Sequence, residues 1–406
     1  MSVTAESTAF RPSIQGWIAR ATVMVIVLEA ILLAVKYVPN FWADRIALAA
    51  VYAIIGLSLN VVLGYTGQVS LGHHAFVGLA AFASAFYVTE KAGCEIDSCS
   101  MTSFSVAMLI AILSGALSAG LLGLVALRIK GLYLALITLT YGFVAVNSIF
   151  EIPALTRGGA GMPAPRPDMF SSDKGFAYLC LIALAIAIYV DWRVVRSKVG
   201  RAILAVKHSE AVAASYAVNV TSYKVIAFML SGAFAGMAGS LFAHRVETVV
   251  AADFNFQVAL LWVLMVVVGG LGRRVGVVIG SAFFALFPYL IQLVAPLNHF
   301  LEDTLKRDPE EFTLVIGPVL ALLTIIQYPG GIAEQLSPVS RWLSGQRFSM
   351  HPDGHGKAAK HKGGLGKLVS RGGKHSPTPE AAAPVTSDDE SPTKELESVG
   401  KGKGRS

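Results

Sequence analysis

The sequence predicts an all-α polytopic membrane protein with about ten transmembrane helices, and three properties of its composition carry that prediction. Of its 406 residues, 54% are hydrophobic and only 15% are charged, whereas soluble globular domains carry about 25% charged residues. The mean hydropathy is +0.61. The apolar residues gather into blocks of about twenty, the length that crosses a bilayer core as a helix. These properties exclude an ordinary soluble enzyme.

Ten apolar blocks are expected to span the membrane. They cover residues 17–36, 45–64, 73–89, 104–127, 131–150, 176–192, 223–243, 257–271, 275–295 and 312–328. The eighth block is short, and only a turn of glycine and arginine separates it from the ninth, so these two are the hardest to delimit. The start of the chain shows no signal-peptide pattern, and the first span is therefore expected to be retained.

The distribution of lysine and arginine predicts that both termini face the cytoplasm. With residues 1–16 as an N-terminal cytoplasmic segment, 12 of the Lys and Arg residues before residue 329 fall on the inner side and 9 on the outer side. Another 12 follow residue 328, so 24 of 33 are inside, as the positive-inside rule requires. An even number of spans also places both termini on the same side.

The predicted spans divide into two sets of five at the outer loop 151–175. Because five is an odd number, a second set that repeats the first is inserted into the membrane upside down. The sequence shows no strong internal identity between the sets. Two inverted five-helix halves are therefore an architectural hypothesis.

The C-terminal tail supplies most of the net charge of +7. Residues 329–406 hold 12 basic and 8 acidic residues, which gives +4 and leaves +3 for the rest of the chain. Residues 345–406 are rich in glycine, lysine and proline, a composition that buries too little apolar surface to offset chain entropy. We expect a disordered, basic and polar cytoplasmic tail, either without a partner or in contact with anionic lipid. Nucleic acid is not an expected partner.

The first segment that departs from a plain apolar helix covers residues 60–78. Its glycines and polar side chains are poorly suited to lipid, where each unmet polar group costs several kcal/mol. Either it forms a short cytoplasmic turn between two spans, or it is a broken, partly re-entrant segment that borders a translocation path. The second interpretation makes path candidates of Asn60, Gly67, Gln68, Ser70, Gly72 and His73.

A second polar segment, residues 156–163, is expected on the outer side. Its glycines can bring backbone N–H groups close to an anionic group. A flexible loop between Pro153 and Pro163 explains the same composition. The first interpretation adds three path candidates, Thr156, Gly158 and Gly161.

The inner loop 193–222 contains a third unusual segment. Residues 201–217 have high helix propensity, with the apolar Ile203, Val206 and Ala213 on one side. The segment predicts a short amphipathic helix on the inner membrane surface, or a helix that docks on a cytoplasmic partner.

Few residues suggest catalysis or ligand binding. The sequence has no Walker A pattern, so this chain is not expected to hydrolyse ATP or to bind a cofactor itself. Ser70 and His73 could serve an intramembrane hydrolase, but the Gly-x-Ser-x-Gly elbow is missing. An ion-driven carrier calls for paired buried carboxylates, and Glu29 is the acid that stands out within a predicted span. Metal-ligand spacing is also missing around His73 and His74.

Cysteine and glycine spacing carries two further predictions. Cys94 and Cys99 lie in an expected outer loop, where an oxidising compartment allows a disulfide. Glycines recur every fourth residue in 232–236 and in 272–280, which predicts close helix packing. The stretch 270–276 superficially resembles a dinucleotide-binding loop, but it lacks the strand–turn–helix context.

Several motifs follow one another in a characteristic order. The most specific block runs from Asn60 to Phe82. The others are Gly131-Leu-Tyr133-Leu-Ala135, Thr156-x-Gly158-x-x-Gly161-Met162, Gly200-Arg201-Ala202, Glu210-Ala211, Lys224-x-x-Ala-Phe228, Gly269-Gly270-x-Gly272, Gly317 and Tyr328-Pro329-Gly330-Gly331-Ile332. Together, over about residues 45–335, they resemble the permease subunits of branched-chain amino acid ABC importers, of the LivM type. Two positions depart from the family pattern: Ala217 stands where a glycine is common, and His74 replaces a small residue.

The resemblance implies a transmembrane permease domain over residues 17–335 that forms the translocation path for leucine, isoleucine and valine. The loop 193–222 would dock on an ATPase, with the coupling candidates Gly200, Arg201, Glu210, Ala211, Ala214 and Lys224. The implied partners are a second permease subunit of the LivH type, two cytoplasmic ABC ATPases that bind ATP and Mg, an extracytoplasmic substrate-binding protein and the lipid of a bacterial inner membrane. Related permeases carry urea or short amides, so the substrate stays open.

Overall fold

The structure is a computed structural model of the whole chain. It describes residues 22, 29–30, 32–94, 99–126, 131–157, 160–294, 319, 326 and 331–332. The segment 1–16, most of the first and last predicted spans and the predicted tail 345–406 lie outside the described residues. The chain divides into two units, Met1–Pro352 and Asp353–Ser406, and every described residue belongs to the first.

Four helices of the described part are long and apolar enough to cross a membrane. They are α2 (Asn40–Leu59) with its π-helical continuation η1 (Asn60–Tyr65), α4 (Met101–Ala126), α7 (Asp173–Arg196) and α10 (Val220–Val246). These helices contain almost all of the second, fourth, sixth and seventh predicted spans, because a helix of this length and composition fits the bilayer core.

Four shorter apolar helices correspond to the third, fifth, eighth and ninth predicted spans. They are α3 (His73–Phe86), α5 (Leu132–Val144), α11 (Phe256–Gly269) and α12 (Arg274–Val294). The first two continue into π-helical turns, η2 (Tyr87–Lys91) and η3 (Ala145–Ile149). The expected glycine turn separates α11 from α12, with Gly270 at φ 106° and Gly272 at φ 80°. The total of ten spans and the inverted halves stay predictions.

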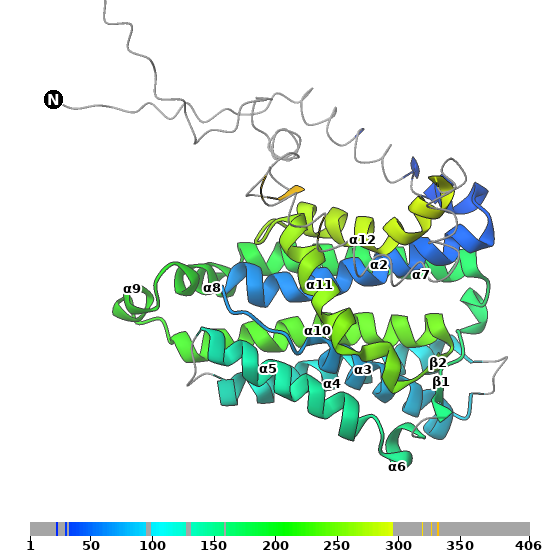
Figure 1. Cartoon of the computed structure of the whole chain (residues 1–406), viewed down its shortest axis with the longest axis horizontal. Helices are drawn as coiled ribbons and strands as arrows, with labels where there is room; N and C mark the ends of the chain where they lie inside the picture. Colours follow the sequence, from blue (N-terminus) through cyan, green and yellow to red (C-terminus); the bar gives the residue numbers. More distant parts are fainter. Residues whose placement is uncertain are drawn as a thin grey trace, which may run out of the picture. The chain divides into compact units, whose positions relative to one another are not determined.

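Helix α10 packs against α2, α3 and α4, while α2 also packs against α7 and α12 (Figure 1). Glycines allow the closest of these contacts, as predicted from their spacing. A Cβ atom added to Gly232 would meet the backbone carbonyl of Gly115 in α4, and one added to Gly236 would meet that of Ala111. The backbones of α4 and α10 therefore touch, which confirms that these glycines serve helix packing.

The two ends of α10 define two ends of this unit. Before Val220 lie α8 (Lys198–His208) and α9 (Glu210–Ser215), which we call the α8–α9 end. After Val246, β2 (Thr248–Val249) pairs with β1 (Met162–Pro163) in an antiparallel register that joins Met162 to Val249. This β1–β2 end also holds α6 (Pro153–Thr156), η5 (Asp168–Phe170) and η6 (Ala251–Phe254).

Candidate functional site

The segment Thr66–Gly72 is a partly buried helix break, in which Ser70 and Gly72 are buried while Gly67 and Val69 are exposed. Its Leu71 N–H donates to Thr138 Oγ1 of α5 at 2.9 Å, and Gly72 lies directly against the Thr138 carbonyl. Helix α3 begins at His73, whose Nε2 is 2.8 Å from Ser231 Oγ. Ser231 lies eleven residues after Val220, where α10 begins, about 17 Å along the helix axis. Helix α3 therefore begins about midway along α10, and whether this start is re-entrant in the membrane stays a prediction.

Two of the predicted path residues belong to a buried hydrogen-bond chain. Ser70 Oγ lies 3.0 Å from His73 Nδ1, and the other ring nitrogen of His73 meets Ser231. The Ser231 hydroxyl donates to the Ser58 carbonyl at 2.8 Å, and the Ser58 hydroxyl donates to the Ser231 carbonyl at 2.7 Å. These four side chains are at most 2% exposed. These hydrogen bonds join α2, α3 and α10. The ring of His73 is oriented by serine, whereas a hydrolase triad uses a carboxylate for this purpose.

Three other path candidates lie toward the α8–α9 end. Asn60 Oδ1 accepts a 2.8 Å hydrogen bond from the Gly272 N–H, which ties η1 to the turn between α11 and α12. Gly67 has a φ of 71° and is exposed, and Gln68 is half-buried. The neighbouring Gly64 carbonyl accepts from Lys207 Nζ of α8 at 2.7 Å. Asn60 is therefore a connector between helix ends.

A buried carboxylate lies at the same end, and the sequence interpretation missed it. Asp191, near the end of α7, is 1% exposed. Its Oδ2 accepts hydrogen bonds from Arg274 Nε at 2.8 Å and from the Tyr65 hydroxyl at 3.1 Å. Glu29, the acid that the sequence places in the first span, is exposed. A single Asp beside Trp192 at the end of an apolar span was the available signal.

The predicted coupling loop forms two helices, so the prediction of one helix over 201–217 is wrong. The break falls at Ser209, which has extended backbone (φ −163°) and caps α9 by accepting the Val212 N–H at 3.3 Å. Serine is favoured at such positions because its hydroxyl accepts a hydrogen bond from a free N–H group at the start of a helix. Ile203, Val206 and Ala213 are each 3% exposed, on the apolar side that the sequence predicted.

Some of the predicted coupling residues are buried and anchor the loop, whereas the others are exposed on its surface. Lys224, only 4% exposed, donates to Glu210 Oε1 at 2.6 Å. Gly200 lies against the backbone of α7, where a Cβ atom would come within 2.6 Å of Val195 Cα. Ala211 and Ala214 are exposed, and so is Arg201. Ala217 closes the loop at φ 59°, a left-handed conformation that glycine adopts more easily.

The path candidates of the glycine-rich segment lie at the opposite, β1–β2 end. Thr156 is 2% exposed, and its hydroxyl lies 2.7 Å from the Phe150 carbonyl. It borders a pocket of about 370 Å³ whose lining is mostly apolar. Gly161 has a φ of 76° and leads directly into β1. Gly158 lies outside the described residues.

A disulfide also lies at the β1–β2 end. The structure joins Cys94 and Cys99, which were predicted as a possible pair. The backbone N–H of Cys99 donates to Asp168 Oδ1 at 3.0 Å. The carbonyl of Cys99 accepts from the N–H of Asp168 at 2.9 Å, so the bridge is held to η5.

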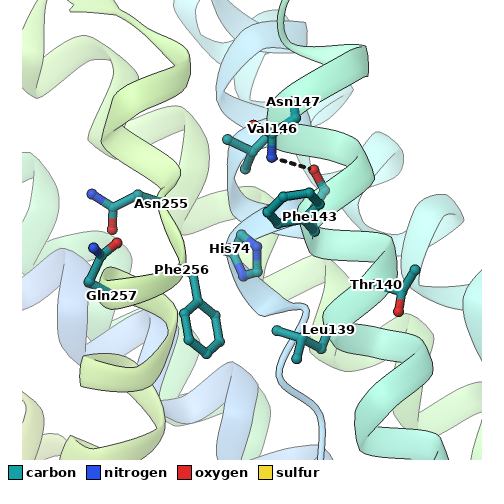
Figure 2. A pocket seen from close by; sticks show the side chains of 9 residues that line it. All are labelled: His74, Leu139, Thr140, Phe143, Val146, Asn147, Asn255, Phe256 and Gln257. Atoms are coloured by element: carbon teal, nitrogen blue, oxygen red, sulfur yellow. Dashed lines mark hydrogen bonds between the residues drawn. The ribbon is translucent and has the colours of Figure 1, made fainter.

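A larger pocket of about 510 Å³ lies between α3, the α5–η3 helix and the start of α11 (Figure 2). It is lined by His74, Leu139, Thr140, Phe143, Val146, Asn147, Asn255, Phe256 and Gln257. Figure 2 shows the amide side chains of Asn255 and Gln257 on one wall and Phe143 and Val146 on the other, with His74 between them. None of the residues predicted for the path lines this pocket.

Comparison with known sequences identifies the family. Residues 42–323 match the family described as "Branched-chain amino acid transport system / permease component". The chain belongs to this family. The permease is 27% identical, over 364 residues, to the "High-affinity branched-chain amino acid transport system permease protein LivM" of Salmonella typhimurium, which covers 82% of the chain and 80% of that protein. LivM of Escherichia coli is 26% identical over 363 residues, with the same coverage. No solved structure matches the permease.

In the permease, the predicted path residues are spread along the helices instead of meeting in one described cavity. Asn60, Gly67 and Gln68 lie toward the α8–α9 end, whereas Ser70, Gly72 and His73 lie about midway. Asn147, Asn255 and Gln257, which line the large pocket, were missed. The signal was weak: each is a neutral polar residue at the end of an apolar block, a place where helix caps are also common.

Proposed function

We propose that this permease is one of the membrane-spanning subunits of an ATP-driven importer, and that it forms part of the path for leucine, isoleucine and valine. Family membership supports this proposal, as do the names of the two relatives. The structural observation that carries it is the loop of α8 and α9. Its outer surface is exposed, and it is anchored by the ion pair of the buried Lys224 with Glu210. A permease driven by separate ATPases needs such a surface.

The exposed part of this loop suits a protein groove. Val212 is 56% exposed and Tyr216 is 80% exposed, beside the exposed alanines 211 and 214. An exposed aromatic residue such as Tyr216 buries apolar area on binding, and aromatic residues are enriched at protein interfaces. The ion pair of Glu210 in α9 with Lys224 in α10 holds these two helices together. An ATPase that moves this loop would therefore also pull on α10.

The loop is also bonded to the helix ends that surround it. Lys207 of α8 donates a hydrogen bond to the Gly64 carbonyl of η1. Asn60 of η1 accepts one from the Gly272 N–H in the turn after α11. Arg274 of α12 bonds to Asp191 of α7. These contacts give a continuous connection from the docking loop to the helix break at residues 66–72. On this proposal, ATPase movement reaches the path through them.

The same proposal includes the partner subunits of the importer and the membrane in which it lies. A second permease subunit of the LivH type, two ABC ATPases that bind ATP and Mg on the cytoplasmic side, and an extracytoplasmic binding protein would complete the importer. The host membrane would be a bacterial inner membrane, with both termini of this chain inside. The α8–α9 end would then face the cytoplasm and the disulfide would face outward, where thiols oxidise.

Reconstitution tests this function. The full chain is co-expressed with its second permease and its ATPases, placed in proteoliposomes and supplied with the binding protein. Uptake of labelled leucine, isoleucine, valine and urea is measured side by side. We expect uptake of the three branched-chain amino acids only with ATP. Uptake of leucine that persists without ATP but follows an ion gradient would instead identify a secondary carrier, and preferred uptake of urea would reassign the substrate.

The buried Ser70–His73 pair allows a separate test against a hydrolase. We expect Ser70→Ala to lower leucine uptake by no more than a few fold, because one neutral hydrogen bond contributes about 1 kcal/mol. In a hydrolase, loss of the nucleophile lowers the rate by many orders of magnitude. Uptake and membrane abundance of the variant, measured in the same cells, separate the two. A complete loss of function at full abundance would contradict the transport assignment of Ser70.

A further inference from the structure

The pocket beside His74 has the chemistry of a binding site as well as a suitable size. Its volume of about 510 Å³ falls in the range of about 300–1,000 Å³ found for small-molecule sites. Its lining combines three amide side chains with two phenylalanines and two aliphatic residues. A few fixed polar groups in an otherwise apolar wall are typical of sites that bind small molecules.

His74 provides a polar group in need of a partner. Its side chain is 1% exposed, and its ring lies beside the backbone of Leu71 and Gly142, while its Nδ1 makes no well-aligned hydrogen bond within the described part of the chain. The ring lies against Gly142 of α5, where a Cβ atom would collide with Cε1 and Nε2. Glycine at this position therefore leaves room for the ring at the pocket. A buried polar atom without a partner costs free energy, which a bound solute or water would recover.

The amide groups add donors and acceptors around this ring. Asn147 uses its Nδ2 to donate to the Phe143 carbonyl at 2.9 Å, as Figure 2 shows. Asn255 uses its Oδ1 to accept from the Val258 N–H at 3.0 Å. Gln257 is exposed and has no hydrogen-bond partner among the residues that the structure describes. The remaining amide oxygens and N–H groups are available to a solute.

The exposed face of the α5–η3 helix differs from a lipid-facing one. Along α4, the exposed residues at successive turns are Leu109, Leu113, Leu117, Leu121 and Leu124, each 55% to 61% exposed. Along α5 and η3, the corresponding exposed residues are Leu136, Thr140, Phe143 and Asn147. Lipid favours the first pattern, whereas polar residues in a membrane span mark a protein contact or a water-filled path.

We propose that this pocket is a solute-contact site on the wall of the translocation path, and that it accepts a net-neutral zwitterion with an apolar side chain. The nine lining residues include no Asp, Glu, Lys or Arg, so neither a net anion nor a net cation finds an opposite charge. Amides and imidazole can pair with both the carboxylate and the ammonium group of an amino acid. Phe143, Val146 and Phe256 offer apolar area to its side chain. This inference rests on the proposed transport function.

Thiol labelling tests the inference in the assembled complex. Asn147→Cys and Gln257→Cys place thiols in the pocket, and Leu117→Cys places one on the leucine face of α4 at 61% exposure. Of the native cysteines, Cys180 is buried and the other two are bridged, so the wild-type chain gives the background. The reagent is a permanently charged methanethiosulfonate, which reacts only where water reaches the thiol.

We expect both pocket thiols to react, and the Leu117→Cys thiol to stay at background. Leucine at about ten times its dissociation constant should slow the pocket reaction roughly tenfold by occupancy. Protection by urea alone would replace the zwitterion by a small amide-like solute and overturn the ligand class. Labelling no faster than at Leu117→Cys, or labelling that neither solute slows, would overturn the contact site.

Transport by two pocket variants gives a second measurement. His74→Leu and Gln257→Leu remove polar groups from the buried and the exposed side of the pocket, so Gln257→Leu still gives a result if His74→Leu fails to fold. We expect leucine uptake to fall about tenfold, the equivalent of one lost hydrogen bond to a charged group, while ATPase activity persists. If the wild-type complex imports leucine and both folded variants match it, only this inference fails. If the wild-type complex does not import leucine, the proposed function fails first.

Discussion

The two ends of the described helices share ion pairs but differ in their other bonds. At the β1–β2 end, two strands pair through their backbones and a disulfide joins Cys94 to Cys99. Arg166 adds donors to the carbonyls of His244 and Arg245 and an ion pair with Asp173. Further ion pairs at this end join Arg245 to Asp44 and Arg166 to Glu247. In the described part of the α8–α9 end, side-chain bonds join the helices without strand pairing or a disulfide.

Those side-chain bonds connect separate helices at single points. Examples are the pairs of Lys224 with Glu210 and of Arg274 with Asp191. Backbone and covalent links keep one geometry, whereas charged side chains can exchange partners when a helix end moves. If an ATPase drives this permease, as proposed, the α8–α9 end would transmit movement, and the strand pairing and the disulfide would hold the β1–β2 end in one geometry.

The largest effect is expected from charge reversal in the coupling loop. Glu210→Lys places a cation beside the buried Lys224 and should lower ATP-driven leucine uptake by about 5- to 150-fold, the range of a typical coupling free energy. The protein should remain in the membrane. Uptake in proteoliposomes and ATPase activity measure the loss.

A matched charge reversal at the other end controls for this variant. Glu90 pairs with Arg157 on an exposed surface at 2.6 Å. Glu90→Lys should leave coupling within about twofold, because an exposed pair contributes little. Equal losses in the two variants would remove the proposed difference between the ends.

The pair of the buried Asp191 with the partly buried Arg274 gives the next largest effect. Asp191→Leu leaves the Arg274 guanidinium and the Tyr65 hydroxyl without their shared acceptor. We expect the free energy of unfolding to fall by about 3 kcal/mol. The double variant Asp191→Leu with Arg274→Met should recover much of it, because no uncompensated charge remains. Denaturant unfolding in detergent measures both, and additive losses would show that the two groups do not interact.

A smaller effect is expected at the β1–β2 end. Arg166→Ala removes bonds to three carbonyls and two carboxylates from a side chain that is 11% exposed, so stability should fall by about 2 kcal/mol. Arg157→Ala, which breaks the exposed pair with Glu90, should cost less than about 1 kcal/mol. Uptake corrected for protein abundance should stay near normal in both. Strong uncoupling by Arg166→Ala would show that this end also moves.

The smallest effect is a gain. Ala217 adopts φ 59°, and a left-handed backbone costs an L-residue about 1–2 kcal/mol. Ala217→Gly should therefore stabilise the loop by up to about 1 kcal/mol after the entropy of glycine is included. Ala214→Gly, in helix α9, should lower stability by about 0.5–1 kcal/mol. Thermal unfolding of the two variants compares them, and a loss in both would mean that Ala217 carries no strain.

The sequence predicted the features that depend on local composition. The long helices follow from apolar blocks of bilayer length, and the contact of α4 with α10 follows from glycines spaced by four. The break at Ser209 could not be predicted from propensity, because a serine in a helical stretch either continues the helix or caps the next one.

The pocket beside His74 could not be predicted from the sequence for a different reason. His74, Asn147 and Gln257 come from three helices that are distant along the chain, and only tertiary packing brings them together. The pairing of Asp191 with Arg274 has the same cause. Residues of this kind become candidates when a structure shows which surfaces meet.

The start of α3 inside the bundle has an electrostatic consequence. A helix N-terminus carries roughly half a positive elementary charge from its aligned peptide dipoles, and here it lies at His73 and His74, about midway along α10. A positive helix end beside a water-filled route is a barrier to cations and protons, whereas a zwitterion can turn its carboxylate toward it. If the proposed path runs beside this break, the end of α3 would therefore oppose the leak of sodium ions and protons along it.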